Sequence, residues 1–357
     1  MPAEAFPLGR ASKPWFLYRL HSRRWLWLVL LSASVIIINI NIVLSAHAQT
    51  CQSAADMDAS VRSALEAAAT RYFDMSARGD TAALRQNSVA ALTANFAGIE
   101  AAVKENQPAF TSAKATVRPP FLLTADGPEP LARAEFLCGV FGKSGQTKDS
   151  AVFILPNLPP GKYGVAILDV DGGQGPRTLT LVLKQTGADW KLAGFYVTSS
   201  QAAGHDAAWF TQRARDFKNK AQNHNAWLYY REAIALSAPV DFMSTLSTDQ
   251  LYDESQAVQP SDVPANGNTV EMRVGGKIYR LTEVFPLAVG SDLDVVVKYQ
   301  ASDVSDTPRA FQENTAVIKA LVTKSPELRE AFAGVVARAV EPSGRDYGTL
   351  LAMKEIK

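Results

Sequence analysis

Hydrophobic and polar positions follow two different periods along this chain, and the change from one to the other divides it. Early on, Val61, Leu65, Ala68 and Tyr72 recur at steps of four, three and four, which is the spacing of one apolar face of an α-helix. Within residues 151–197, short apolar runs bounded by turn residues replace that spacing, and such runs predict strands. The pattern therefore predicts an α+β fold with helices on either side of a sheet.

Four apolar runs predict the strands of that sheet, at residues 151–155, 163–170, 178–183 and 190–197. Clusters of Pro, Gly, Asn and Asp separate them and read as turns. Ahead of them, Pro119-Pro120 forces an extended backbone into the next residues, and residues 136–141 predict another strand. The sheet is expected to organise the first half of the chain.

Two or three helices are expected before the sheet. Gly79-Asp80 should end the first, and Asp80 should cap the next, over residues 81–87. A third helical stretch is expected through Phe96 and Val103, ending at residues 106–108.

The stretch YFDMSARGDTAAL at residues 72–84 resembles the helix–Gly-Asp–helix opening of the nuclear transport factor 2-like (NTF2-like), or SnoaL-like, superfamily. Residues 190–197 resemble that superfamily's last strand, so the likeness covers about residues 54–198. It implies a curved antiparallel sheet folded around helices into a cone with a pocket, in isomerases, dehydratases or non-catalytic binding modules. Residues 153–163 resemble instead a strand-turn of carboxypeptidase-regulatory-like β-sandwiches, which lack long leading helices.

The cone that this likeness implies would be either hollow or filled. An acid–base pair within it could serve isomerase or dehydratase chemistry, and Asp74 and Glu135 are the candidate carboxylates. The aromatic side chains that would line a pocket, or form a plain core, are Tyr72, Phe73, Phe136, Phe153, Trp190 and Phe195.

Residues 205–254 predict a helical hairpin. Helices are expected at 209–219 and 226–236, and the small and aromatic residues Phe217, Ala226, Tyr230 and Ala233 resemble the packing pattern of one tetratricopeptide repeat. Only one copy is visible, whereas such arrays need about three. A peptide-binding groove or a hairpin packed beside the sheet fits these residues.

A polar stretch at residues 255–268 predicts a linker, and residues 269–357 predict a second, small α+β domain. Gly275-Gly276 should form a two-residue hairpin turn between strands 270–274 and 277–281. Further strands are expected at 294–299, 335–340 and 350–353. A helix face runs from Phe311 to Val322, and Ser325-Pro326-Glu327 is expected to start another helix.

The first 48 residues carry an export signal. Five basic residues precede the charge-free apolar run 25–45, and Ala46-His47-Ala48 then supplies the small-x-small pattern of signal peptidase sites. The run suits a cleaved signal peptide or a retained transmembrane anchor, because about 20 apolar residues span a bilayer. We expect a secreted or periplasmic protein, or a single-pass one whose C-terminal part lies outside the cytoplasm.

Composition narrows the chemistry further. The chain is 47% apolar and 20% charged, as in globular proteins. Residues 1–48 hold five Lys or Arg and one Glu, so the +1 of the whole chain becomes about −3 for the rest, and a nucleic-acid partner is not expected. Cys51 and Cys138 would meet an oxidising compartment, where they either form a disulfide or remain a flexible thiol and a small buried side chain.

Few residues suit a catalytic or metal site. Beyond residue 48 the only histidines are His205 and His224, too few for a three-histidine zinc site. Asp206 should cap the helix after His205, and His224 is expected to face solvent. The Asp169-Val170-Asp171-Gly172 stretch lacks the spacing of a calcium loop and reads as a turn.

These observations favour an exported, non-catalytic binding protein of the cell envelope, without cofactor or metal, that takes a protein or a small apolar ligand. A small cone-fold lyase or isomerase and a membrane-anchored structural protein of the envelope are the alternatives.

Overall fold

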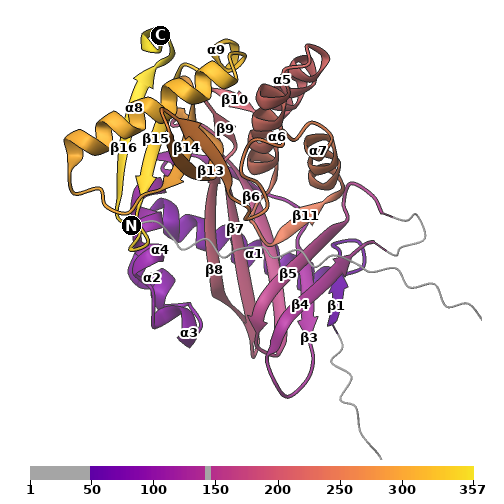
Figure 1. Ribbon diagram of the computed structural model, residues 1–357. Coiled ribbons are helices and arrows are strands. Elements are labelled where there is room, and N and C mark those ends of the chain that lie inside the picture. Colours follow the sequence, from indigo (N-terminus) through magenta and orange to yellow (C-terminus); the bar gives the residue numbers. More distant parts are fainter. Residues whose placement is uncertain (1–48, 141–145) are drawn as a thin grey trace, which may run out of the picture. The chain divides into compact units, whose positions relative to one another are not determined.

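The computed structural model describes residues 49–140 and 146–357 (Figure 1). The expected signal or anchor run 25–45 and its cleavage site at Ala46 and Ala48 lie outside these residues. The described part mixes helices with several mostly antiparallel sheets, which confirms the predicted α+β class. Among the described residues, no helix is both long and apolar enough to cross a bilayer.

The helices that precede the first sheet form largely where the period of four and three predicted them. Asp80 caps α2 by accepting a hydrogen bond from the Ala83 amide at 3.0 Å, and Gly79 supplies the left-handed residue, φ +68°, that ends the preceding helix. Two helices stand where a third single helix was expected, and the second of the two continues for two residues past Pro108. The four are α1 (Ala59–Ala77), α2 (Thr81–Gln86), α3 (Ala90–Thr93) and α4 (Ala97–Phe110).

The first sheet has both of its faces covered. Its strand order is β1-β3-β6-β7-β8, with β2 also paired to β6. The central β6 is buried over six consecutive residues, as expected for a strand with neighbours on both faces. The strands are β1 (Gln49–Gln52), β2 (Lys114–Val117), β3 (Phe121–Ala125), β6 (Gly161–Asp171), β7 (Arg177–Thr186) and β8 (Asp189–Ser199).

Helices α1 and α4 pack on one face of this sheet, and the second sheet packs on the other. Ala166 and Leu168 of β6 join the helices in one core cluster, whereas Val165 and Ile167 join the second sheet in another. Gly164 lets α1 approach closely, since a Cβ there would lie 2.1 Å from a methyl carbon of Leu65.

The second sheet corrects the prediction that residues 151–197 build one sheet. Strand β5 (Ala151–Leu158) leaves the first sheet and pairs with β4 (Leu131–Cys138) and β11 (Met243–Thr245). The turn at Pro159 reverses the chain onto the other layer, and β11 comes from 85 or more residues further on, so no local pattern could reveal this pairing.

The helical hairpin comprises α5 (Ala207–Asn219) and α6 (Asn223–Ser237), followed by α7 (Leu246–Gln256). A small two-stranded sheet, β9 (Gln201–Ala202) with β10 (His205–Asp206), precedes it. Phe210, Phe217 and Tyr229 of the hairpin belong to the same buried cluster as Val335 of the C-terminal sheet. Val258 and Val263, in the stretch expected to be a linker, are buried in this cluster too.

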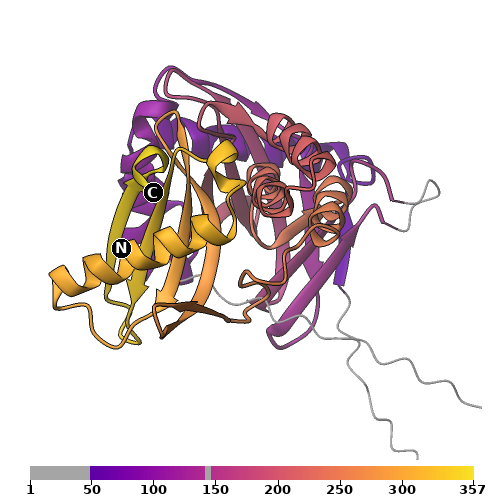
Figure 2. The same cartoon turned by 45° about the horizontal axis from the view of Figure 1, so that its top comes forward.

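The C-terminal sheet has the strand order β12-β13-β14-β15-β16, all antiparallel except β14 with β15. Both glycines of the predicted Gly275-Gly276 turn have positive φ, +56° and +81°, as that turn requires. Figure 2 shows α8 running along one face of these strands. The elements are β12 (Val270–Val274), β13 (Lys277–Val289), β14 (Asp292–Gln300), α8 (Thr307–Lys324), α9 (Leu328–Ala331), β15 (Gly334–Val340), β16 (Asp346–Ala352) and the 3₁₀ turn Met353–Glu355.

Candidate interaction face of the C-terminal sheet

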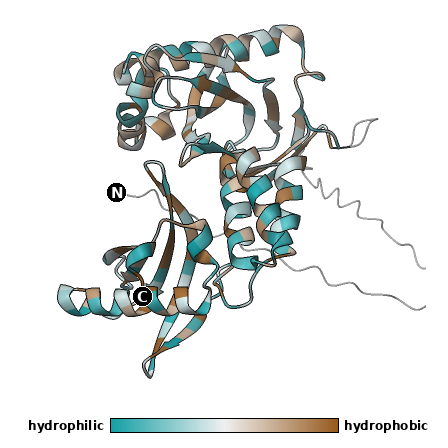
Figure 3. Cartoon of the chain, turned by 90° about the horizontal axis from the view of Figure 1, so that it is seen from above, coloured by the Kyte–Doolittle hydropathy of each residue, from teal (hydrophilic) through white to brown (hydrophobic). Residues whose placement is uncertain are grey.

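Helix α8 covers one face of the C-terminal sheet, and among residues 49–140 and 146–357 no helix covers the other. Val295 and Val297 of β14 join the buried cluster that contains Ile318 of α8. Val296 lies between them in the strand, so its side chain points to the opposite side. We name this opposite side the open face. Figure 3 shows α8 beside the sheet and hydrophobic stretches, in brown, along its strands.

A row of four apolar residues crosses the open face from strand to strand. The register places Phe285 beside Val296, Val296 beside Val336, and Val336 beside Leu350. Val296 is only 1% exposed because its neighbours flank it, whereas Leu350 at the end is 54% exposed. We name these four residues the apolar row.

Other apolar side chains extend this row. Seven large hydrophobic side chains of the described residues are exposed, and four of them point to the open face. These are Ile278, Leu287, Val289 and Leu350, at 47%, 43%, 53% and 54% exposure. Scattered exposed hydrophobic residues are normal on a protein surface, but their concentration on one face of one sheet makes that face a candidate interaction site.

Charged residues border the apolar row on one side. Alternation places Glu283, Lys298, Arg338 and Asp346 on the open face. Lys298 lies 2.8 Å from the Glu283 carboxylate, and Arg338 forms an ion pair with Asp346. An apolar centre beside a paired, charged rim is the usual composition of a protein–protein interface.

One carboxylate is buried within this face. Asp294 is 4% exposed, and burial, with the nearby Asp292 carboxylate adding to it, raises its pKa above the ordinary value. A hydrogen bond from the Gly334 backbone opposes that rise. Gly334 also makes room, since a Cβ there would lie 2.9 Å from the Asp294 carboxylate oxygen. Besides the charged rim, the open face therefore holds one buried carboxyl group, which a backbone hydrogen bond partly stabilises.

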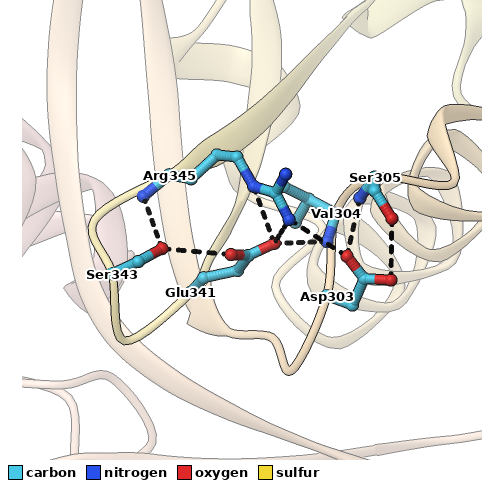
Figure 4. A network of polar contacts seen from close by, with 6 residues as sticks. All are labelled: Asp303, Val304, Ser305, Glu341, Ser343 and Arg345. Atoms are coloured by element: carbon cyan, nitrogen blue, oxygen red, sulfur yellow. Dashed lines mark hydrogen bonds and ion pairs between the residues drawn. The ribbon is translucent and has the colours of Figure 1, made fainter.

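A polar cluster fixes the start of β16 against the loop before α8 (Figure 4). Arg345 donates to the Glu341 carboxylate at 2.6 Å and to Asp303 at 3.1 Å. The Val304 amide donates to the same Glu341 oxygen at 2.7 Å, and Ser305 donates to Asp303. The hydrogen bonds from Arg345 and Val304 hold the pKa of Glu341 below its ordinary value. The cluster therefore joins the β15–β16 turn to the segment that leads into α8.

His224 lies in a second polar cluster, between the helical hairpin and the C-terminal domain. Its Nδ1 lies 2.7 Å from Glu327, and its Nε2 lies 2.8 Å from Asp262. Both partners are carboxylates, which accept hydrogen bonds. Burial alone would raise the pKa of Asp262, but hydrogen bonds from Lys324 and His224 together lower it. The expectation that His224 faces solvent is wrong, since its side chain is 17% exposed.

Ser325 contributes to this cluster rather than to a helix. It lies 3.3 Å from Nε2 of His224 and is 1% exposed. Helix α9 begins three residues later without a side-chain cap, so the predicted Ser325 cap is not formed. A serine, a histidine and a carboxylate are thus in contact. Asp262 lies closer than Ser325 to the same ring nitrogen, at 2.8 Å against 3.3 Å. The geometry is that of a structural contact between segments.

Glu232 is the most perturbed carboxyl group of the hairpin. It lies on α6 and is half-buried, and burial raises its pKa to about 7 although neighbouring Arg231 lowers it. A carboxyl group that titrates near neutral pH is suited to acid–base chemistry. Among the described residues it has no hydrogen-bond or ion-pair partner.

The six aromatic residues expected to line or fill a cone are all buried, in two separate clusters. Four of them pack with the helices on one face of the first sheet, and two pack with the second sheet on the other. Tyr72 also places its hydroxyl 2.8 Å and 2.9 Å from the Asn87 and Trp190 carbonyl oxygens. The first group is Tyr72, Phe73, Trp190 and Phe195, and the second is Phe136 and Phe153.

The other residues singled out in the sequence lie apart from one another. Asp74 and Glu135 are exposed, so the expectation that they face an interior is wrong. Cys51 of β1 and Cys138 of β4 form a disulfide with 5.0 Å between their Cα atoms, which links the first sheet to the second. His205 stacks on the Trp209 ring at 3.7 Å.

Smaller predictions at turns have clear outcomes. Asp206 caps α5 through the Trp209 amide at 2.9 Å, as predicted. Asp169 belongs to β6 and forms an ion pair with Arg118. Among the described residues, no group of three or more His, Cys, Asp and Glu side chains is placed to hold a metal ion.

The sequence prediction missed the open face because it ended the strand that begins at Lys277 at residue 281, eight residues before β13 ends. Strand β13 runs on to Val289 through Pro286, and proline inside an apolar run argues against a central strand. The alternation of Glu283, Phe285, Leu287 and Val289 was the available signal. No family model, curated protein or solved structure matches this chain.

Proposed function

We propose that this chain is an exported, non-catalytic binding protein of the cell envelope, which presents the open face of its C-terminal sheet to a partner protein. The observation that carries the proposal is the apolar row with its charged rim. An apolar row across four strands beside a charged rim has the composition of a protein–protein interface, whereas small ligands bind in concave pockets.

The state of the ionisable groups supports a non-catalytic role. Both histidines of the part after residue 48 serve packing, His205 by stacking on Trp209 and His224 by contacting two carboxylates. The aromatic residues of the N-terminal domain pack against helices or the second sheet. In this proposal that domain is an NTF2-like cone with a filled interior, and the α5–α6 hairpin is a single tetratricopeptide-like unit packed onto the C-terminal sheet.

The experiment is site-directed photo-crosslinking in cells that express the full chain. A photoreactive phenylalanine analogue at Leu287, on the open face, is compared with the same analogue at Leu137, which is 39% exposed on β4. We expect one protein adduct at position 287, lost when Phe285→Ser is added, and none at 137. Equal labelling at both positions, or no adduct at 287, would overturn the proposal. Mass spectrometry of the same protein's N-terminus distinguishes a cleaved chain that begins near Gln49 from a membrane-anchored envelope protein.

A lyase or isomerase is a second candidate, and Glu232 favours it, because burial raises the pKa of this carboxyl group to about 7. The measurement is turnover of carbonyl-activated small substrates by wild type and by Glu232→Gln. Turnover that Glu232→Gln abolishes without loss of fold would replace the binding function with this one.

A further inference from the structure

The two sides of the C-terminal sheet differ: β12 covers only the first part of β13 on one side, and β16 forms the whole edge on the other. Beyond residue 281, β13 has no β12 residue beside it. There Arg231 of α6 donates to the Val284 carbonyl oxygen, which shows that the backbone groups of Val284 point outward. Pro286, two residues on, points the same way and has no N–H to offer. The part of β13 that β12 leaves uncovered is therefore blocked against a further strand.

The other edge, along β16, carries no such protection. Hydrogen bonds from Glu341 N to Arg345 O and from Met353 N to Ala333 O bracket its ladder with β15. Alternation then turns every second residue of β16 outward. In the described part of the chain no strand pairs with these outward groups. They belong to Asp346, Gly348, Leu350 and Ala352.

The sequence of β16 is complementary to itself in the antiparallel direction. When a second copy pairs about a twofold axis at Thr349, all four outward residues find a partner. Leu350 then lies over Gly348 of the other copy, where little fills the space above the glycine. Asp346 meets Ala352, so like charges do not face each other, and Tyr347 meets Leu351 on the α8 side. A large residue over a small one and apolar residues in pairs stabilise such a strand pair.

Helix α8 also suits this pairing. Glu313 contacts Lys277 at the β12–β13 end of the sheet, so Phe311, two residues or about 200° away around the helix, lies on the flank toward β16. Phe311 is 46% exposed there. Because α8 packs over β15 and β16, strand spacing would place the two α8 helices about 10 Å apart, a normal distance for packed helices.

We propose that two copies of this chain associate through β16, as an antiparallel strand pair that forms one ten-stranded sheet with the two α8 helices packed together. Leu350 on the open face and Phe311 on the α8 face become buried at the contact. The Arg345 cluster of Figure 4 holds the start of β16 in place before association. In this register the apolar row of each copy ends beside Gly348 of the other copy, in line with the charged rim residues Arg338 and Lys298. The dimer does not depend on the proposed function.

The test is analytical ultracentrifugation of the protein expressed as the full 357-residue chain and purified as the cell processes it. Wild type is expected to sediment as a dimer at micromolar concentration. Leu350→Lys and Phe311→Glu should each weaken dimerisation at least tenfold. The matched control is Leu287→Lys, on the same open face and similarly exposed but at the blocked edge, which should leave the dimer unchanged.

A second variant tests the register. Gly348→Cys combined with Leu350→Cys should give a covalent dimer on mild oxidation, whereas Leu287→Cys with Val289→Cys should not. A wild-type protein that is still monomeric at about 100 micromolar would overturn the proposal, because a dimer that forms only above this concentration would be very weak. A dimer that survives both Leu350→Lys and Phe311→Glu, with circular dichroism showing that each variant is folded, would overturn it too.

Discussion

The first sheet and the C-terminal sheet are built from similar strands but are covered differently. The first has helices on one face and the second sheet on the other, and β6 is accordingly buried residue after residue. The C-terminal sheet has α8 on one face only, and four of its large hydrophobic side chains are exposed on the other. The difference teaches that similar strands can be buried on both faces or leave large hydrophobic side chains exposed on one, and it is the second case that suggests binding.

The strongest way to break this comparison is to truncate one phenylalanine in each sheet region. Phe153 is fully buried between the first and second sheets, so Phe153→Ala should lower the free energy of unfolding by about 4 kcal/mol. Phe285 lies half-exposed on the open face, and Phe285→Ala should cost about 1 kcal/mol. Urea unfolding of both variants measures the difference. Equal losses would mean that the open face is covered in the folded protein.

Removal of the disulfide should affect the first two sheets alone. Cys51 and Cys138 are 87 residues apart in sequence, and a cross-link over such a loop stabilises by about 3 kcal/mol, chiefly by restricting the unfolded chain. Cys51→Ser with Cys138→Ser should lose about this amount and speed amide exchange in β1, β3 and β4. Exchange in β14 and β15 is the internal control. A matching acceleration there would show that the two sheet regions unfold together.

The dependence of folding stability on pH should come chiefly from Glu232 of the α5–α6 hairpin. Burial raises the pKa of Glu232 to about 7, so between about pH 4.5 and 7 the folded chain binds a proton that the unfolded chain has released. Stability therefore falls as pH rises through this window. Glu232→Gln should stabilise the protein by up to about 2 kcal/mol at pH 8 and leave it unchanged at pH 4.

Thermal unfolding at the two pH values measures this effect, and Glu135→Gln, an exposed residue of β4, serves as the control. If Glu135→Gln gave the same pH-dependent gain, the effect would come from overall charge and not from burial.

The smallest expected effect is at the Arg345 cluster. Arg345 and Asp303 are exposed, while the Glu341 side chain is 9% exposed, and ion pairs of exposed groups contribute little to global stability. Arg345→Ala should leave the unfolding midpoint unchanged but speed amide exchange in the β15–β16 turn. Lys191→Ala on β8 is the control, with no change in that turn. A clear drop of the midpoint would show that the cluster supports the whole C-terminal sheet.

Caps and turns formed by neighbouring residues could be predicted from the sequence, whereas contacts between residues far apart in the chain could not. Asp80, Asp206 and the Gly275-Gly276 turn act within a few residues of themselves, so their roles could be predicted. His224 could not, because its partners lie 38 and 103 residues away. The departure of β5 to the second sheet is another case, since β11 pairs with it from far along the chain.

The candidate site was hidden for a related reason. The sequence predicted strands at both ends of the C-terminal domain, but the apolar row exists only once four strands are in register. Because a proline argues against a central strand, the strand was predicted to end at residue 281, before Pro286. Leu287 and Val289 were therefore not recognised as members of a sheet face.

That proline also limits how many copies can join. A sheet with two free edges that pairs at one of them still has the other to offer, and repeated addition gives a fibre. Here Pro286 and Arg231 block β13 beyond residue 281, which leaves only the five-residue β12 on that side, and a twofold contact at β16 uses up the other edge in both partners. Further addition through this sheet would have only the short β12 left to pair with, so the residue that interrupts the strand's hydrogen bonding also limits growth of the sheet into a fibre.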